Sequence, residues 1–182
     1  MTNINFTPFP VLITERLTLR QLSTDDQQDI FTLRSDGEIN RYLGRQPAKS
    51  MEDAVTFINK INDSINSNNS IYWVITLTKT RTFAGTICLF DFADGNSSCE
   101  IGYELMTKFQ GQGIMKEAAE RVIDYAFQVL QFKKIVAFTH NGNQHSTRLL
   151  TKLNFIKSAA PDKENTDFNI YNLFKLATAG KS

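Results

Sequence analysis

The sequence predicts an α/β fold in which helices cover the faces of one mixed β-sheet. Its hydrophobic patterns run in the order strand, helices, three consecutive strands, helix, and a final strand–helix–strand segment, which is typical of such a sheet. The short Asp94-Gly95-Asn96 turn makes two of the strands an antiparallel hairpin, because a parallel crossover needs about a dozen residues. The 182 residues, 41% of them hydrophobic, suffice for one domain with its own core, predicted to span 1–182.

The first part of the chain is predicted to hold one strand and then helices. Arg16–Leu22 alternates apolar and polar residues, as a half-buried strand does. Ser23 or Thr24 is suited to cap a helix that continues to about Ser35. A short helical stretch is expected near Glu38–Leu43.

A longer helix is predicted to begin after Ser50. Ser50 and Asp53 have the spacing of a capping box, in which each side chain bonds the other residue's backbone N–H. The polar run 67–70 ends the helix. Its apolar residues share one face and are Val55, Ile58, Ile61 and Ile65.

The second part of the chain is predicted to form the rest of the sheet. Aromatic and β-branched residues dominate three expected strands, which are Tyr72–Thr78, Phe83–Phe92 and Cys99–Met106. Helical spacing then extends over Ile114–Leu130. The remaining expected elements are a strand at Lys133–Thr139, a helix at Asn143–Leu153, and strands at Phe155–Ser158 and Asp167–Lys175.

The charge balance excludes several classes of partner. Twenty Lys and Arg residues against nineteen Asp and Glu residues leave a net charge of +1, so no strong field favours nucleic acid or an anionic membrane. No apolar run approaches the roughly 18 residues that a membrane helix needs. Met1–Asn5 has neither the basic start nor the apolar stretch of a signal peptide. We therefore expect a cytoplasmic protein with no nucleic-acid and no membrane partner.

The cysteines and histidines do not form a metal-binding pattern. Cys88 and Cys99 lack the spacing of a zinc site and are read as buried small hydrophobic residues, although an oxidised pair across a hairpin stays open. His140 and His145 stand without a matching set of Cys or Asp residues and are read as loop histidines. The sequence therefore predicts no metal.

The most informative stretch is Gln110–Met115, which lies between a strand and an amphipathic helix. Its two glycines let several backbone N–H groups turn toward one point at a helix N-terminus, where an anion is favoured. The stretch lacks the Gly-Lys-Ser/Thr ending of a P-loop. Lys116 takes the place of the third glycine of a dinucleotide fingerprint, and no acid ends the next strand. The spacing predicts a phosphate or pyrophosphate cradle of another kind, with a plain strand-to-helix turn as the alternative.

This loop resembles the Gln/Arg-x-x-Gly-x-Gly/Ala coenzyme A pyrophosphate loop of the GNAT acetyltransferase superfamily. Gln110 and Gly113 match that pattern, and Met115 departs from its last position. Four further segments resemble the branch that acetylates ribosomal-protein N-termini (RimJ/RimL type). They are Thr14–Arg20, Arg41–Leu43, Glu100–Leu105 and the Asn143–Ser146 start of the Asn-x-x-Ser…Lys-x-Gly-Phe pattern, in which Asn154 replaces the glycine.

The resemblance implies a GNAT fold. The sheet is then mixed, mostly antiparallel and six- to seven-stranded, with helices on both faces and a splayed coenzyme A cleft. The strand through Leu105 and Met106 would border that cleft, and the Met106 backbone N–H would receive the thioester carbonyl.

The resemblance also implies acetyl-CoA as co-substrate. Asn143 would hydrogen-bond the pantetheine arm, and its alternative role is that of a turn-forming asparagine. The backbone amides expected to hold the pyrophosphate are those of Gln110, Gly111, Gln112, Gly113, Ile114 and Met115.

Two residues are candidates for proton transfer. Glu100 is the candidate proton acceptor, directly or through a water, and otherwise an exposed strand carboxylate; Glu104, on the same strand face, is its rival. Ser146 is the candidate acid for the leaving thiolate, since the resemblance places it near the sulfur, and otherwise a helix-capping serine.

The resemblance implies acetyl transfer to a primary amine, with a protein N-terminal amine, such as that of a ribosomal protein, as the favoured acceptor. A polyamine, an aminoglycoside or an amino-acid-like amine is the alternative, and a non-catalytic coenzyme A-binding module is a further one. The protein is expected to be a monomer or a homodimer. Residues of the early helices that would line an acceptor groove, or else a solvated helix face, are Arg34, Asp36, Asn40 and Tyr42.

Overall fold

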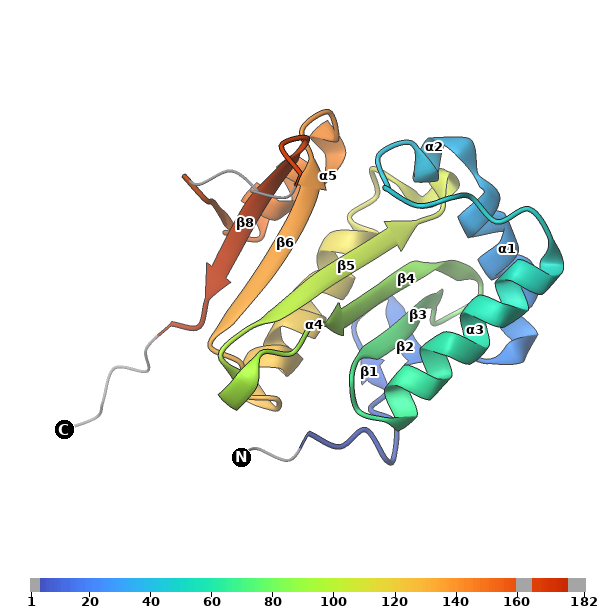
Figure 1. Ribbon diagram of the computed structural model, residues 1–182. Helices are drawn as coiled ribbons and strands as arrows, with labels where there is room; N and C mark the ends of the chain where they lie inside the picture. Colours follow the sequence, from blue (N-terminus) through green and yellow to red (C-terminus); the bar gives the residue numbers. More distant parts are fainter. Residues whose placement is uncertain (1–3, 160–164, 177–182) are drawn as a thin grey trace.

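The computed structural model describes residues 4–159 and 165–176 and consists of one sheet with helices packed on it (Figure 1). The strands are β1 (Leu12–Ile13), β2 (Leu17–Gln21), β3 (Ile71–Leu77), β4 (Phe83–Phe90), β5 (Cys99–Leu105), β6 (Lys134–His140), β7 (Ile156–Lys157) and β8 (Phe168–Phe174). The helices are α1 (Gln27–Ser35), α2 (Gly37–Asn40), α3 (Met51–Asn66), α4 (Ile114–Gln128) and α5 (Gln144–Lys152).

The sheet has the order β1-β2-β3-β4-β5-β6-β8-β7. Every neighbouring pair is antiparallel except β5 and β6, which are parallel. The expected mixed, mostly antiparallel sheet is therefore confirmed. The seven expected strands are present, and the two-residue β1 adds an eighth at the edge.

Local backbone chemistry explains where several elements begin and end. The strand expected over Phe83–Phe92 ends at Phe90, because Asp91 has a φ of 51° that extended backbone does not allow. Ser50 and Asp53 form the expected capping box of α3. The short helix begins earlier than expected, at Gly37, because the Asp36 carboxylate caps its first turn.

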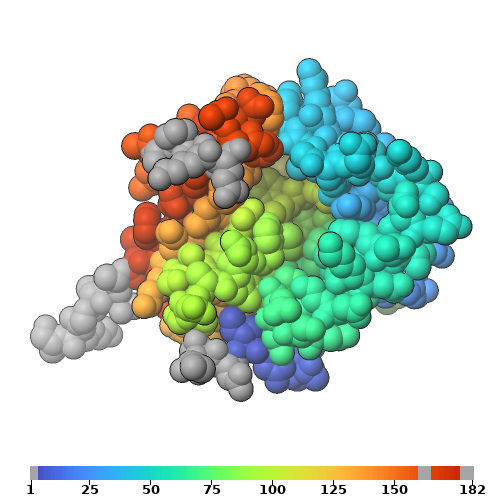
Figure 2. Space-filling view, in the orientation of Figure 1, coloured from blue at the N-terminus to red at the C-terminus, as the bar shows by residue number. Residues whose placement is uncertain are grey.

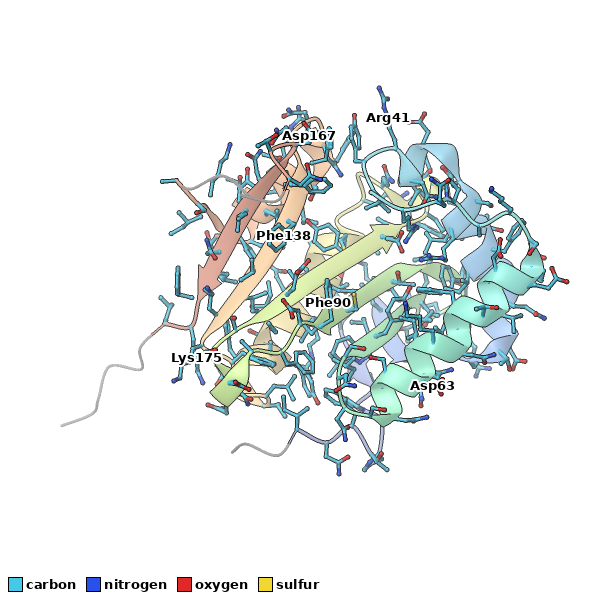
Figure 3. The ribbon with its side chains drawn as sticks, in the orientation of Figure 1. Arg41, Asp63, Phe90, Phe138, Asp167 and Lys175 are labelled. Atoms are coloured by element: carbon cyan, nitrogen blue, oxygen red, sulfur yellow. The ribbon has the colours of Figure 1, made fainter. Side chains whose placement is uncertain are left out.

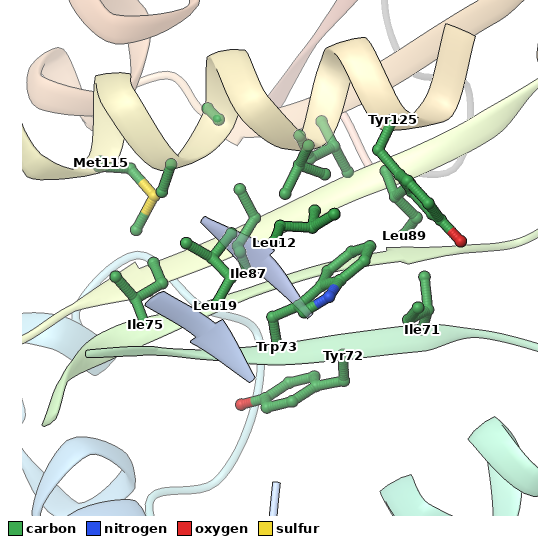
Figure 4. Close-up of a cluster of buried hydrophobic side chains, with 14 of the residues drawn as sticks. Leu12, Leu19, Ile71, Tyr72, Trp73, Ile75, Ile87, Leu89, Met115 and Tyr125 are labelled. Carbon is green, nitrogen blue, oxygen red and sulfur yellow. The ribbon is translucent and has the colours of Figure 1, made fainter. Parts of the chain in front are cut away.

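Neighbouring residues of the central strand β3 face helices on opposite sides of the sheet. The Tyr72 ring lies 5.8 Å from Phe57 of α3, while the Trp73 ring lies 5.7 Å from Tyr125 of α4. Figure 1 shows α1 and α3 in front of the sheet and α4 behind it. Trp73 is fully buried, and its indole N–H donates to Pro10 O at 2.8 Å. The main core thus lies between the sheet and α4 (Figure 4).

The two cysteines lie on opposite faces of the sheet. Cys88 of β4 pairs with Gly102 and lies beside it, whereas Cys99 belongs to the alternate face of β5. Both thiols are free, and burial raises the pKa of each to about 12. The open possibility of a disulfide is therefore wrong for this structure.

The parallel strands β5 and β6 part soon after they meet. They pair only at Cys99 with Ile135 and at Glu100 with Val136. Beyond Glu100 the two strands diverge toward the upper part of Figure 1. This is the splayed opening that the resemblance implied, and within the described residues no strand pairs with the edge of β5 that faces it beyond Glu100. No helix in the described ranges 4–159 and 165–176 is long and apolar enough to cross a membrane.

Gly85 allows β4 and β5 to approach each other beside this opening. A Cβ there would lie 2.2 Å from Glu104 O and 2.9 Å from the Leu105 Cα, so backbone must shift. Gly85→Ala is expected to lower the free energy of unfolding by about 1–3 kcal/mol, the usual cost of overpacking. Denaturant unfolding measures this loss. Gly37→Ala, where nothing lies within 4 Å of the new Cβ, is the matched control and should be near neutral; equal effects of the two variants would contradict the account.

Candidate active site

The loop before α4 has the geometry of an anion cradle. Gly111 and Gly113 have φ values of 74° and 77°, a backbone region that favours glycine. Gly113 is the N-cap of α4 and supplies no side-chain cap, so the first amides of the helix point outward uncapped by it. Ile114 and Met115 are buried and fix the first turn, and Figure 4 shows Met115 pointing from α4 into the core. The inward packing of Met115 explains why this chain has a side chain where the family pattern has Gly or Ala.

Arg16, from the turn before β2, braces this loop. Its Nε donates to Glu117 Oε2 at 2.6 Å and its Nη1 to Gln112 O at 3.1 Å. Thr14 Oγ1 also donates to Glu117, at 2.6 Å. Burial raises the pKa of Glu117, but these hydrogen bonds outweigh it and lower the pKa overall. The brace compensates a carboxylate in the first turn of α4 that would otherwise repel an anion.

The backbone N–H groups of β5 and Met106 point in directions that differ from one expectation. The Met106 N–H donates to Ala84 O at 2.9 Å and so points toward β4. Its expected role toward the thioester carbonyl is therefore wrong. Because N–H groups alternate along a strand, the Leu105 N–H points toward the opening instead. Gln110 Nε2 donates to Leu105 O at 3.2 Å, which ties the loop to this edge.

Glu100 lies where β5 and β6 part. It is opposite Phe90 on one side and Val136 on the other, and its side chain is partly buried. Burial raises its pKa to about 7, and Asp91 adds to the shift. Among the described residues, no cation lies within ion-pair distance of Glu100. Its rival Glu104 instead forms an ion pair with Arg45, which leaves Glu100 as the unpaired carboxylate of this strand face.

At the start of α5, Asn143 and Ser146 have different roles from those considered above. Asn143 is the N-cap, and its Oδ1 accepts from the Ser146 N–H at 3.0 Å. The capping role considered for Ser146 thus belongs to Asn143, and the amide Nδ2 of Asn143 takes no part in that cap. The Ser146 hydroxyl lies 2.8 Å from the hydroxyl of Tyr103, across the opening between β5 and α5. Burial raises the pKa of Tyr103 to about 12. Sequence patterns missed Tyr103, because an aromatic residue within a strand carries no signal of a partner 43 residues away.

A pocket of about 290 Å³ adjoins this opening on the side of α1 and α3. Figure 2 shows the hollow between the cyan and teal helical segment and the green strands, and Figure 3 shows Phe90 on the same side of the sheet. Polar and charged residues that line it include Arg34, Arg45, Tyr72, Tyr103 and Glu104. Tyr103 therefore belongs to both the pocket and the Ser146 contact.

Of the four residues expected along an acceptor groove, Arg34 lines this pocket. Its guanidinium lies 3.8 Å from the centre of the Phe57 ring. Asn40 is buried and accepts a hydrogen bond from Arg45 Nε at 2.8 Å, so it supports the pocket from behind. Asp36 caps α2, and Tyr42 packs against His140.

His140 has structural contacts. His140 Nδ1 accepts from the Gly142 N–H at 3.0 Å, and its ring packs on Tyr42 and Phe168. Within residues 4–159 and 165–176, no group of three or more His, Cys, Asp or Glu residues is placed to hold a metal ion.

Sequence comparison finds the same fold family along most of the chain. The family model described as an acetyltransferase (GNAT) domain matches residues 16–156. The uncharacterized N-acetyltransferase YoaA of Bacillus subtilis (strain 168) is 31% identical over 173 residues, which are 92% of this chain and 98% of YoaA.

Two solved structures show the same architecture with different acceptors in their names. The ribosomal-protein-S5-alanine acetyltransferase from Vibrio fischeri has a TM-score of 0.75 and 19% identity, covering 91% of this chain and 96% of that one. The spermidine N-acetyltransferase from Vibrio cholerae, in complex with CoA and spermine, has a TM-score of 0.77 and 22% identity, covering 88% and 96%. At these identities the likeness establishes the fold.

Proposed function

The chain belongs to the GNAT family of acetyltransferases and is an acetyl-CoA N-acetyltransferase, and from that premise we propose that its acceptor is the N-terminal amine of a protein. The observation that carries this proposal is the pocket beside the β5–β6 opening, which Tyr103 connects to Ser146. This function requires a donor site, a pair of proton-transfer residues and an acceptor site.

The donor site is assigned to the cleft and the loop before α4. The left-handed glycines Gly111 and Gly113 turn backbone amides of Gln110–Met115 toward one point, where the dipole of α4 favours a pyrophosphate. The Leu105 N–H on the cleft edge is assigned to the thioester carbonyl, where charge develops during transfer. Asn143, through its Nδ2, is assigned to the pantetheine arm. These groups suit acetyl-CoA. The backbone N–H groups of the loop can bind its phosphates, and the Leu105 N–H and Asn143 can bind its thioester and amide-containing arm.

Glu100 and Ser146 are assigned to the two proton transfers. When the amine attacks the thioester carbonyl, a C–N bond forms, the C–S bond breaks and one amine proton must leave. Glu100 accepts that proton, directly or through a water, and its pKa of about 7 suits a base at neutral pH. Ser146 donates a proton to the leaving thiolate, and its contact with Tyr103 orients the hydroxyl.

The pH dependence of turnover tests the assignment of Glu100. Since the base must be deprotonated, kcat/KM is expected to rise with pH through about 7. Asp91→Asn removes the negative charge that raises the pKa of Glu100, and Asn tolerates the positive φ of 51° at this position. The rising limb should therefore move to lower pH. Asp94→Asn, a nearby control, should leave the rising limb in place. If Asp91→Asn also leaves the limb at the same pH, Glu100 is not the base that the limb reports.

The acceptor is tested by acetyl-CoA-dependent thiol release with a panel of amines. We expect peptides with a free N-terminus to be acetylated with higher kcat/KM than spermidine, an aminoglycoside or free amino acids. N-terminally blocked peptides are the control and should be inert. A higher kcat/KM for a small amine than for these peptides would contradict the proposal that the acceptor is a protein N-terminus. Tight acetyl-CoA binding without transfer to any amine, unchanged in Glu100→Gln and Ser146→Ala, would indicate a non-catalytic coenzyme A-binding module.

A further inference from the structure

The acceptor pocket contains one cation without a carboxylate partner. Among the described residues, no Asp or Glu side chain lies within ion-pair distance of Arg34. Its guanidinium is held flat against Phe57, with 3.8 Å to the ring centre. Its backbone is fixed too, because Arg34 O accepts from the Ala48 N–H and from Asn40 Nδ2, both at 3.0 Å. Arg34 is thus a pre-positioned, uncompensated positive charge.

The other two charges of the pocket compensate each other. Arg45 forms an ion pair with Glu104, and its Nε is held by Asn40 Oδ1 at 2.8 Å. The pocket therefore has a net positive charge, and that charge is the one on Arg34. Burial and the neighbouring Arg45 lower the pKa of Arg34 while Glu104 opposes this, so the cation is disfavoured by its surroundings and an incoming anion would relieve that cost.

A second hollow, which also has Arg34 in its lining, extends the charged surface. It has about 270 Å³ and is lined by Arg34, Lys49, Asp53 and the backbone turn at Pro47. The Asp53 carboxylate accepts from the N–H groups of Lys49 and Ser50, which turns it toward the helix start. Arg34 therefore lines both hollows, a position suited to a chain that extends from the second hollow past Arg34 into the pocket that Tyr103 lines.

From this geometry we infer that the acceptor amine belongs to a molecule with a carboxylate close to the amine, and that Arg34 binds that carboxylate. The inference rests on the proposed function and names the chemistry of its acceptor: a protein N-terminus with Asp or Glu among its first residues. A guanidinium stacked on an aromatic ring loses little freedom when it binds a carboxylate with two parallel hydrogen bonds. The same positive charge repels polyamines.

The test compares matched peptides that differ only at the second residue. Ala-Glu, Ala-Gln and Ala-Lys peptides, with amidated C-termini, are assayed by thiol release with the wild-type protein. We expect kcat/KM to be about tenfold or more higher for the Glu peptide than for the Lys peptide, mainly through KM. Free glutamate and spermidine are the small-molecule arms. A preference for free glutamate over the Glu peptide would support carboxylate binding by Arg34 but contradict the protein acceptor, because the acceptor would then be a small molecule.

The variants separate the role of Arg34 from that of the fold. Arg34→Gln should abolish the preference for the Glu peptide, mainly by raising its KM, while the Kd of acetyl-CoA stays nearly unchanged, and Arg34→Lys should restore part of the preference. Arg41→Gln is the control, since Arg41 lies over Tyr42 outside the pocket. Equal kcat/KM for the three peptides with wild-type protein would overturn the inference alone. Acetyl-CoA binding with no transfer to any peptide would overturn the proposed function and this inference with it.

Discussion

Glu100→Gln is expected to lower kcat by about 10²–10⁴-fold at neutral pH, the usual contribution of a positioned general base. Glutamine keeps the size and the hydrogen-bonding shape of the side chain but cannot accept the amine proton. Because Glu100 lies away from the loop before α4, the Kd of acetyl-CoA should hardly change. Single-turnover transfer and calorimetric binding measure the two quantities separately. Glu120→Gln, an exposed carboxylate of α4 paired with Lys116, is the control and should keep wild-type turnover.

Although Glu100→Gln is expected to lower kcat, it is expected to increase the stability of the fold at high pH. The folded-state pKa of Glu100 is raised from 4.5 to about 7, chiefly by burial, so the ionised carboxylate is less favourable in the folded than in the unfolded chain. Stability that is present below the unfolded pKa is therefore lost as the pH rises through about 7. Glu100→Gln should raise Tm relative to wild type at pH 8 and have little effect at pH 5. Wild-type kcat in this variant would remove Glu100 from the mechanism, whatever its Tm.

Gly113→Val is expected to raise the Kd of acetyl-CoA at least tenfold. A β-branched residue at a φ of 77° is strained by about 1–2 kcal/mol or more, so the loop must rotate its amides away from the shared point. The Arg16 guanidinium, 3.5 Å from the Cβ position, is in ordinary contact with it, so the loss comes from the backbone strain. That strain acts directly on the proposed anion cradle.

Gly95→Val is the matched control for this loss. Gly95 also has a left-handed φ, 63°, and open space around its Cβ position, but it lies in the turn before β5. The two variants share the backbone penalty, so both should lower Tm. Only Gly113→Val should weaken acetyl-CoA binding. Equal affinities in the two variants would mean that the loop does not hold the donor.

Much of the fold was predictable because its signals are local. The alternation in Arg16–Leu22, the capping box at Ser50 and the helical spacing of Ile114–Leu130 each depend on neighbours within a few residues. The two-residue β1 was missed, because a strand that short has no periodicity to detect. Strand ends also shifted, as at Asp91, where one positive φ ended β4.

The site could be predicted from the sequence where its residues are close together along the chain. The prediction failed where the geometry depends on strand register or on contacts between distant residues. Which N–H of β5 faces the cleft is decided by its hydrogen bonds with β4, so Met106 was chosen where Leu105 points to the opening. The Tyr103–Ser146 contact joins residues 43 positions apart, and the Arg16–Glu117 brace joins residues 101 positions apart. No pattern in a single sequence specifies such pairs; the fold brings them together.

Calorimetric titration of the purified protein with acetyl-CoA, with NADH and ATP as controls, is the most direct test of the proposed donor site. We expect selective binding of acetyl-CoA, because the loop before α4 and the edge of β5 at Leu105 recognise its pyrophosphate and pantetheine arm together. Neither control carries that arm, so neither should compete at similar concentration. Absence of acetyl-CoA binding, or equal binding of the three compounds, would contradict the donor site and the proposed acetyl transfer with it.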